Sequence, residues 1–168
     1  KSKLMTGRLS GGVVGTLMTN LGLEHALKKE GIEFERANVG DRHVMEKLMD
    51  KGWSVGGESS GHIICLDKTS TGDGIIASLQ VLDWLVEKDI TLTKACNGMS
   101  LYPQIMINVP IAKKIDLQSL PAVQQSVSAA ESELNGKGRV LLRASGTEPL
   151  IRVMVEGENY AQVNDLAY

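Results

Sequence analysis

The stretch Gly12-Val13-Val14-Gly15-Thr16-Leu17-Met18 starts an alternation of short apolar runs and amphipathic segments that occupies the first half of the chain. We predict a strand over residues 12–18, followed by a helix that Asn20 caps and that ends at Gly31. A second strand is predicted over residues 34–39. Strands that alternate with helices are typical of an α/β fold. We therefore expect an α/β domain, with a mixed sheet and flanking helices, over residues 1–99.

The remainder of this domain follows the same pattern. Asp41 stands where an N-cap belongs, and the apolar residues after it repeat at helical spacing as far as Gly52. Two short strands are predicted over residues 53–55 and 63–66, on either side of a polar, glycine-rich stretch. Asp73 then precedes the clearest helical pattern of the chain. The apolar positions of that helix are Ile75, Ile76, Leu79, Leu82, Leu85 and Val86.

The pattern changes at TLTKACNGMSLYP, residues 91–103, where Asn, Gly, Ser and Pro stand between two periodic regions. We predict a domain boundary near Ser100. The elements expected downstream are a strand over 104–109, a helix over 123–134, strands over 139–143 and 151–156, and the start of another helix. This order predicts a small α+β domain over residues 100–168, with an antiparallel sheet and helices on one face.

The composition is that of an ordinary globular protein. The 168 residues are 42% hydrophobic and 23% charged, with a formal net charge of -2. Because the basic residues form no strip that could neutralise a row of phosphates, nucleic acid is not an expected partner. Cys65 and Cys96 lack a CxxC spacing and are expected to be free thiols. No apolar run approaches the length of a membrane span, so we expect no membrane partner and a cytoplasmic location.

Arg143 and Arg152 bracket the loop ASGTEPLI, which is rich in glycine and hydroxyl groups. Two guanidinium groups, the hydroxyls of Ser145 and Thr147, and the backbone N–H of Gly146 could converge there on one anion. Arginine suits a phosphate because its fork can contact two oxygens at once. The alternative is a solvated hairpin turn with its arginines in surface ion pairs.

A second polar stretch, GGESSGH at residues 56–62, combines a carboxylate, hydroxyls and an imidazole in a glycine-rich turn. Glu58, Ser60 and His62 could present donors and acceptors to the hydroxyls of a sugar. The alternative is a hairpin loop in which Glu58 and Ser60 bond to local backbone groups, and in which His62 is structural.

Gly40, Asp41 and Arg42 end a predicted strand and open a helix, at the position where open α/β sheets bind ligands. Asp41 is more simply explained as the N-cap, whereas Arg42 could reach a ligand. The acidic residues of Asp67–Asp73 lack the spacing of an EF-hand, and we favour helix capping for them. No motif typical of serine hydrolases, zinc proteases, P-loop NTPases or dinucleotide enzymes is found.

Three motifs together resemble the α-D-phosphohexomutase family. They are GGESSGH at residues 56–62, LDKTSTGDGI at residues 66–75 and LLRASGTEPLIRVMVEG at residues 141–157. The resemblance covers nearly the whole chain in the family's order. It implies that residues 1–99 correspond to most of the third domain of these four-domain enzymes, and residues 100–168 to most of the fourth.

The resemblance also implies roles for both polar stretches. Members interconvert hexose 6-phosphates and hexose 1-phosphates through a bisphosphorylated intermediate. The implied sugar-binding residues are Glu58, Ser60 and His62, and the implied phosphate-binding residues are Arg143, Ser145, Gly146, Thr147 and Arg152. Gly40, Asp41 and Arg42 match a further loop of the third domain, for which the resemblance defines no specific ligand contact.

The family's phosphoserine and its Mg²⁺-binding DGDxDR-type loop are not found in this sequence, and we assign no catalytic residue and no metal ligand. We expect the chain to be an inactive piece of a longer enzyme whose other domains are its partners and bind Mg²⁺. The motifs are most similar to members that convert glucosamine 6-phosphate to glucosamine 1-phosphate for cell-envelope precursors. The alternatives are members that act on 2-hydroxy sugars, and a non-catalytic phosphosugar-binding module.

Overall fold

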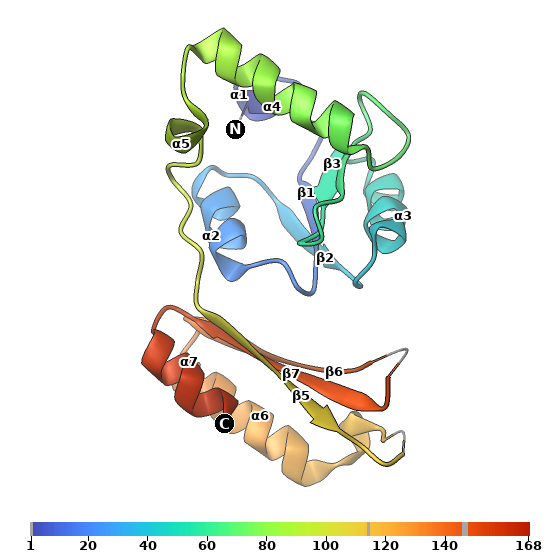
Figure 1. Cartoon of the computed structure of the whole chain (residues 1–168), viewed down its shortest axis with the longest axis vertical. Coiled ribbons are helices and arrows are strands. Elements are labelled where there is room, and N and C mark those ends of the chain that lie inside the picture. The colour runs from blue at the N-terminus through green and yellow to red at the C-terminus, as the bar shows by residue number, and fades with distance from the viewer. Residues whose placement is uncertain (1, 114, 146–147) are drawn as a thin grey trace. The chain divides into compact units, whose positions relative to one another are not determined.

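The computed structural model describes residues 2–113, 115–145 and 148–168. The chain forms two compact units, Lys1–Ser100 and Leu101–Tyr168. Each unit has its own sheet, its own helices and its own buried core (Figure 1).

The first unit contains a mixed sheet with the strand order β2-β1-β3-β4. Its strands are β1 (Val13–Thr16), β2 (Phe34–Ala37), β3 (Val55–Gly57) and β4 (Ile63–Cys65). Strand β1 pairs in parallel with both β2 and β3, whereas β3 and β4 are antiparallel. The helices are α1 (Ser2–Met5), α2 (Leu21–Lys29), α3 (Asp41–Lys51), α4 (Gly74–Lys88) and α5 (Leu92–Ala95). The predicted α/β class and mixed sheet are confirmed.

Side-chain caps explain where two of these helices begin. Asn20 Oδ1 accepts a hydrogen bond from the Gly22 N–H, as expected for the N-cap of α2. The Asp73 carboxylate caps α4 in the same way, at 2.8 Å from the N–H of Ile75. Each bond satisfies a backbone donor that has no partner within the helix.

The predicted cap of α3 was wrong by one residue. Gly40 is the N-cap, with a φ of 122° that favours glycine, and Asp41 is the first helical residue. The Asp41 carboxylate accepts from the N–H of Arg42. An acidic side chain in the first turn is still favourable, because it faces the positive end of the helix dipole.

The core of the first unit lies where α3 packs against β1 and β3. Val14, Val44 and Leu48 are fully buried there, and Ile64 and Trp53 belong to the same cluster. By contrast, the described residues of α4 include none that is buried, although most of its positions are apolar. Removing a large core side chain such as Leu48 would cost about 2–5 kcal/mol.

The second unit has an antiparallel sheet with the strand order β5-β7-β6. Its strands are β5 (Gln104–Pro110), β6 (Gly138–Ala144) and β7 (Leu150–Gly157). The helices α6 (Pro121–Leu134) and α7 (Tyr160–Ala167) cover one face of this sheet (Figure 1), and a short 3-10 helix, η1 (Leu117–Ser119), precedes α6. The predicted α+β class is confirmed; the short α1, α5 and η1 were not predicted, because single turns carry no periodic signal.

The two faces of this sheet differ in chemistry. Val140 and Val155 pack against Leu134 and Val163 of the helices. On the opposite face, Arg139 lies directly across from Glu156, whose side chain is fully buried, and its Nε is 2.7 Å from the Glu156 carboxylate. A buried carboxylate is costly unless it is paired, so removing Arg139 is expected to destabilise this sheet.

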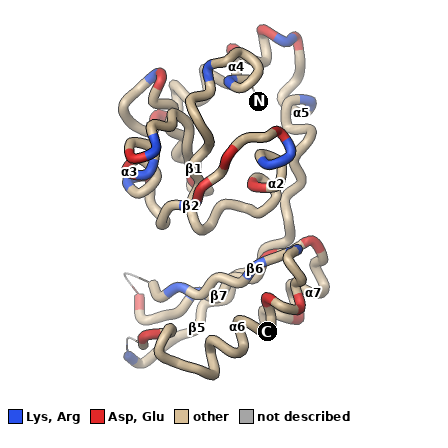
Figure 2. The backbone as a smooth tube through the Cα atoms, turned by 180° about the vertical axis from the view of Figure 1, so that it is seen from behind, with Lys and Arg blue, Asp and Glu red and all other residues tan. Residues whose placement is uncertain are grey.

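Figure 2 shows that basic and acidic residues are interleaved along α3 and over both units. This distribution agrees with the absence of a basic strip in the sequence. Among the described residues, no helix combines the length and apolar character needed to cross a membrane.

Candidate functional site

The loops that carry the first group of predicted residues leave the same edge of the mixed sheet. Because β1, β2 and β3 are parallel, their carboxyl ends lie together, toward the bottom of the first unit in Figure 1. The loop after β2 contains Gly40, and the turn after β3 contains Glu58, Ser60 and His62. Ligands of open α/β sheets commonly bind at this edge.

A tight turn between β3 and β4 presents the polar side chains. The Glu58 N–H donates to the carbonyl of His62 at 3.0 Å, and the Gly61 N–H donates to the carbonyl of Glu58 at 3.1 Å. Gly61 has a φ of 99°, which other residues rarely adopt. Glycine at this position therefore allows the chain to reverse within the few residues that hold Glu58, Ser60 and His62.

Glu58, Ser60 and His62 form one hydrogen-bonded cluster. Ser60 Oγ donates to Glu58 Oε1 at 2.7 Å, and His62 Nδ1 lies 3.0 Å from both Ser60 Oγ and Glu58 Oε1. Since an ionised carboxylate can only accept, these distances assign a hydrogen to Nδ1 and leave Nε2 as the second polar atom of the ring. The cluster is thus preorganised before any ligand binds.

The Glu58 carboxylate is held in its charged form. Hydrogen bonds from Ser60, His62 and the Gly40 N–H lower the pKa of Glu58, against the opposing effect of partial burial. The Glu58 side chain is only 10% exposed, whereas that of His62 is 55% exposed. The exposed imidazole, through Nε2, and the anchored carboxylate together offer two polar groups to the hydroxyls of a polyol.

The predicted loop of Gly40, Asp41 and Arg42 contributes only partly to this cluster. The Gly40 N–H donates to Glu58 Oε2 at 3.1 Å, so the backbone of this loop does reach the cluster. Arg42 instead pairs with Glu46 one turn along α3, and its side chain is 84% exposed. The structure does not bring the guanidinium of Arg42 to the Glu58 carboxylate.

The second group of predicted residues lies on the sheet of the second unit. Arg143 in β6 and Arg152 in β7 are direct cross-strand partners, on the face opposite the helices. Like charges directly opposite each other destabilise a sheet. Among the described residues, Arg143 forms no hydrogen bond or ion pair that would offset this repulsion.

The hydrogen-bond donors of Arg152 are also incompletely satisfied within the described part of the chain. Its Nε is buried and has no hydrogen-bond partner within the described parts of the chain. Its only ion pair there is a long one, 3.4 Å from the guanidinium to the Glu148 carboxylate. Ser145 Oγ accepts from the Glu148 N–H at 3.2 Å. Gly146 and Thr147, the other predicted phosphate ligands, lie outside the described residues.

The stretch Asp67–Asp73 has structural contacts. Asp67 accepts two hydrogen bonds from Lys3 Nζ, at 2.6 and 2.7 Å, and Asp73 caps α4, which confirms the capping interpretation for that residue. Within residues 2–113, 115–145 and 148–168, no group of three or more His, Cys, Asp or Glu side chains could hold a metal ion. The described residues therefore do not fit a Mg²⁺ site.

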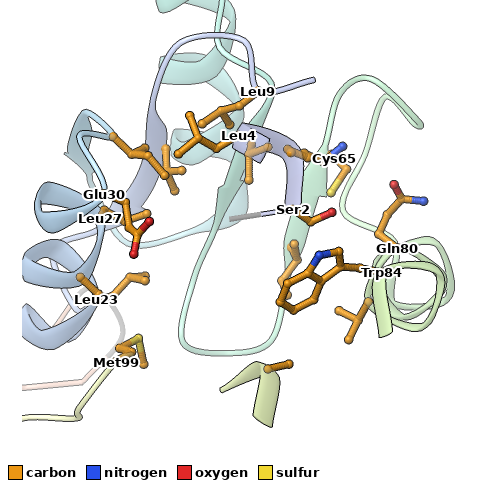
Figure 3. Close-up of a pocket in the computed structure, with 18 of the residues that line it drawn as sticks. Ser2, Leu4, Leu9, Leu23, Leu27, Glu30, Cys65, Gln80, Trp84 and Met99 are labelled. Atoms are coloured by element: carbon orange, nitrogen blue, oxygen red, sulfur yellow. The ribbon is translucent and has the colours of Figure 1, made fainter. Parts of the chain in front are cut away.

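A cavity of about 470 Å³ lies elsewhere in the first unit (Figure 3). Its lining includes Leu23 and Leu27 of α2 and Trp84 of α4, and none of the described residues that line it is a predicted site residue. Trp84 Nε1 is buried and has no hydrogen-bond partner in the described part of the chain. The apolar lining distinguishes this cavity from the polar cluster around Glu58.

Sequence reasoning missed two contacts at these sites. The Gly40 N–H was not expected to bond to Glu58, since the two residues meet only when β2 and β3 flank β1. Glu148 was not assigned a role, although it pairs with Arg152. Its position within the loop between the two arginines was the available signal.

Comparison with protein families identifies both units. The family description "Phosphoglucomutase/phosphomannomutase, alpha/beta/alpha domain III" matches residues 2–102. The description "Phosphoglucomutase/phosphomannomutase, C-terminal domain" matches residues 106–168. These matches cover the two polar clusters described above.

Individual relatives support the same family assignment. The chain is 58% identical over 167 residues to phosphoglucosamine mutase of Aeromonas hydrophila, which covers 99% of this chain and 38% of the relative. It is 62% identical over 161 residues to phosphoglucosamine mutase of Methylobacillus flagellatus, over 96% of this chain and 36% of the relative. The chain thus spans little more than a third of these relatives and matches their C-terminal part.

Solved structures show the same fold. Aspergillus fumigatus N-acetylphosphoglucosamine mutase, solved in complex with GlcNAc-6P and magnesium, matches 96% of this chain and 40% of its own with a TM-score of 0.77 at 24% identity. Another structure of that fungal enzyme matches 97% of this chain and 38% of its own with a TM-score of 0.79 at 25% identity. The chain belongs to the phosphoglucomutase/phosphomannomutase family of phosphohexomutases.

Proposed function

We propose that this chain is the substrate-binding C-terminal portion of a phosphoglucosamine mutase, which interconverts glucosamine 6-phosphate and glucosamine 1-phosphate through a bisphosphorylated intermediate. Identities of 55–62% to bacterial phosphoglucosamine mutases over the whole chain support this choice of substrate. In the proposal, the first unit binds the sugar and the second unit binds the phosphate that is not being transferred.

The observation that carries the proposal is the pairing of Arg143 with Arg152 across β6 and β7. Two guanidinium groups on adjacent strands repel each other, and the buried Nε of Arg152 has no described partner. A phosphate dianion would remove both costs, because it can accept from both guanidinium groups at once. Ser145, Gly146 and Thr147 complete the proposed phosphate loop.

The cluster around Glu58 supports the sugar-binding half of the proposal. A charged carboxylate, a hydroxyl and an imidazole within 3.0 Å of one another are a suitable set of partners for vicinal hydroxyl or amino groups. Glu58 would accept from the ligand and His62 would donate or accept through Nε2. Gly40 holds the Glu58 carboxylate in place from the neighbouring loop.

The chain's own residues would bind and orient the phosphosugar. A bisphosphorylated intermediate must present either phosphate to the reacting group, so the same distal phosphate site and sugar site have to accept both orientations. We place the phosphoserine and the Mg²⁺, which would supply the phosphoryl group and stabilise its charge, in other domains of the longer enzyme. The isolated chain is accordingly expected to have no mutase activity.

The test compares substrates and variants of a full-length enzyme that contains this chain. Glucosamine 6-phosphate is expected to have a higher kcat/KM than glucose 6-phosphate or mannose 6-phosphate. Arg143→Ala is expected to raise KM for each substrate. A preference for the 2-hydroxy sugars would instead assign the chain to a phosphomannomutase or phosphoglucomutase. Binding of phosphosugar without any turnover would favour a non-catalytic module.

A further inference from the structure

Asn108 occupies a position next to the arginine pair that the sequence did not single out. Strand β7 lies between β5 and β6, and Arg152 is the direct partner of Asn108 on one side and of Arg143 on the other. Directly opposite residues of an antiparallel sheet project to the same face. Asn108, Arg152 and Arg143 therefore form one row across the sheet.

This row lies on the face of the sheet that the helices leave uncovered. On β5, Ile105 packs against the helix-side core. The residues that alternate with it project to the other face and are exposed; they are Gln104, Met106 and Asn108. Within the described residues, the Asn108 side chain forms no hydrogen bond. An amide at this position therefore has donor and acceptor capacity that the fold itself does not use.

The chemistry of the row suits an anion. Two guanidinium groups supply the charge, and Asn108 adds a neutral amide at the cross-strand position next to Arg152, whose Nε lacks a described partner. A carboxylate at position 108 would pair with Arg152 and compete with the anion, whereas an amide adds a donor without competing. The residue type thus favours an open anion site over an internal ion pair.

We propose that Asn108 is a further binding residue for the substrate phosphate, donating from Nδ2 to a phosphate oxygen that Arg152 also contacts. This assignment rests on the proposed function, because it takes the row of Arg143 and Arg152 to be the phosphate site. It adds to that function a recognition group from β5, outside the loop between β6 and β7.

The experiment uses the full-length enzyme and inorganic phosphate as a competitive probe. Asn108→Ala is expected to raise the inhibition constant of phosphate, and KM for the phosphosugar, about tenfold, the loss of one hydrogen bond to a charged group. Asn108→Asp is expected to raise both further, because the new carboxylate repels the anion and pairs with Arg152. Inhibition by unphosphorylated glucosamine is expected to stay unchanged in both variants.

Matched controls separate this effect from general damage. Gln104→Ala removes an amide from the same strand and the same exposed face, and Gln125→Glu adds one charge on the exposed side of α6. Both are expected to retain the wild-type inhibition constant. Thermal unfolding of each variant reports whether the fold is intact.

The outcomes distinguish this inference from the proposed function. If Arg143→Ala weakens phosphate inhibition but Asn108→Ala and Asn108→Asp do not, the role of Asn108 is overturned while the phosphate site stands. If neither Arg143→Ala nor the Asn108 variants weaken inhibition, both proposals fail. Equal weakening by Gln104→Ala would also overturn the role of Asn108, because the effect would not be specific to the row.

Discussion

The backbone N–H of Gly40 donates a 3.1 Å hydrogen bond to Oε2 of Glu58 and so joins the loop after β2 to the turn after β3. Oε1 of the same carboxylate accepts from Ser60. Both oxygens are therefore anchored, and the orientation of the carboxylate is set by two loops that are distant in sequence. A group held in this way loses little entropy when it binds a ligand.

Replacing Glu58 by Gln should weaken sugar binding. The amide keeps the size of the side chain but loses the charge and presents donors where Gly40 and Ser60 already donate. In the full-length enzyme we expect KM for glucosamine 6-phosphate to rise about tenfold or more. Steady-state kinetics measure this change, and Glu46→Gln on the exposed side of α3 is the control. An unchanged KM for Glu58→Gln would remove Glu58 from the sugar site.

The same carboxylate should make stability depend on pH. Since its folded-state pKa is lowered, chiefly by the hydrogen bond from Ser60, its contribution is present above the ordinary pKa of a glutamate. That contribution is lost as the pH falls through the lowered value. Urea unfolding of the wild type and of Glu58→Gln should therefore differ at neutral pH and converge in acid. A difference that grows as the pH falls would contradict the assigned contacts.

Replacing Arg143 by Ala should separate ligand binding from stability. The loss of a hydrogen bond to a charged group is expected to weaken phosphosugar binding by about 1.5–3 kcal/mol. The unliganded protein should be no less stable than the wild type, because the cross-strand repulsion from Arg152 is removed. Calorimetric titration and thermal unfolding measure the two effects. Marked destabilisation without loss of binding would show that Arg143 is structural.

Replacing Arg139 by Met should destabilise the unliganded protein, which Arg143→Ala should not do. Arg139 is on the same face of β6, but its partner is the fully buried carboxylate of Glu156 rather than a second cation. Removing one member of a buried ion pair costs about 3–5 kcal/mol. Chemical denaturation should detect this loss, and the double variant Arg139→Met with Glu156→Gln should recover part of it. Full stability of the single variant would contradict the structural role.

The two cysteines should react at different rates. Both are free thiols, as predicted, but Cys65 is buried in the sheet and Cys96 is exposed. Burial raises the pKa of the Cys65 thiol, and the thiolate is the reactive form. An aromatic disulfide reagent at neutral pH should label Cys96 promptly and Cys65 only after unfolding. A Cys96→Ser variant identifies the fast phase, and its persistence in that variant would contradict the burial of Cys65.

Much of the fold could be predicted from local patterns. A short apolar run predicted β1, alternation predicted β5, and helical spacing with a capping residue predicted α2 and α4. The position of Asp73 at the start of α4 followed from the chemistry of an N-cap. The exact cap of α3 did not follow, because Gly40 and Asp41 are adjacent and both residue types are common there. Only the backbone conformation of Gly40 decides between them.

The sequence by itself determined the family, because motifs such as GGESSGH and RASGTEPLIR consist of consecutive residues and need no tertiary contact to be identified. The tertiary structure decided which of these residues meet partners from elsewhere. Parallel pairing of β1 with β2 and β3 brings the Gly40 N–H to Glu58, and the antiparallel register places Arg152 between Asn108 and Arg143. The contacts of Gly40 with Glu58 and of Asn108 with Arg152 join residues that are separated in the chain by intervening helices. They depend on which strands become neighbours across long connections, and the residues of a single strand do not specify this order.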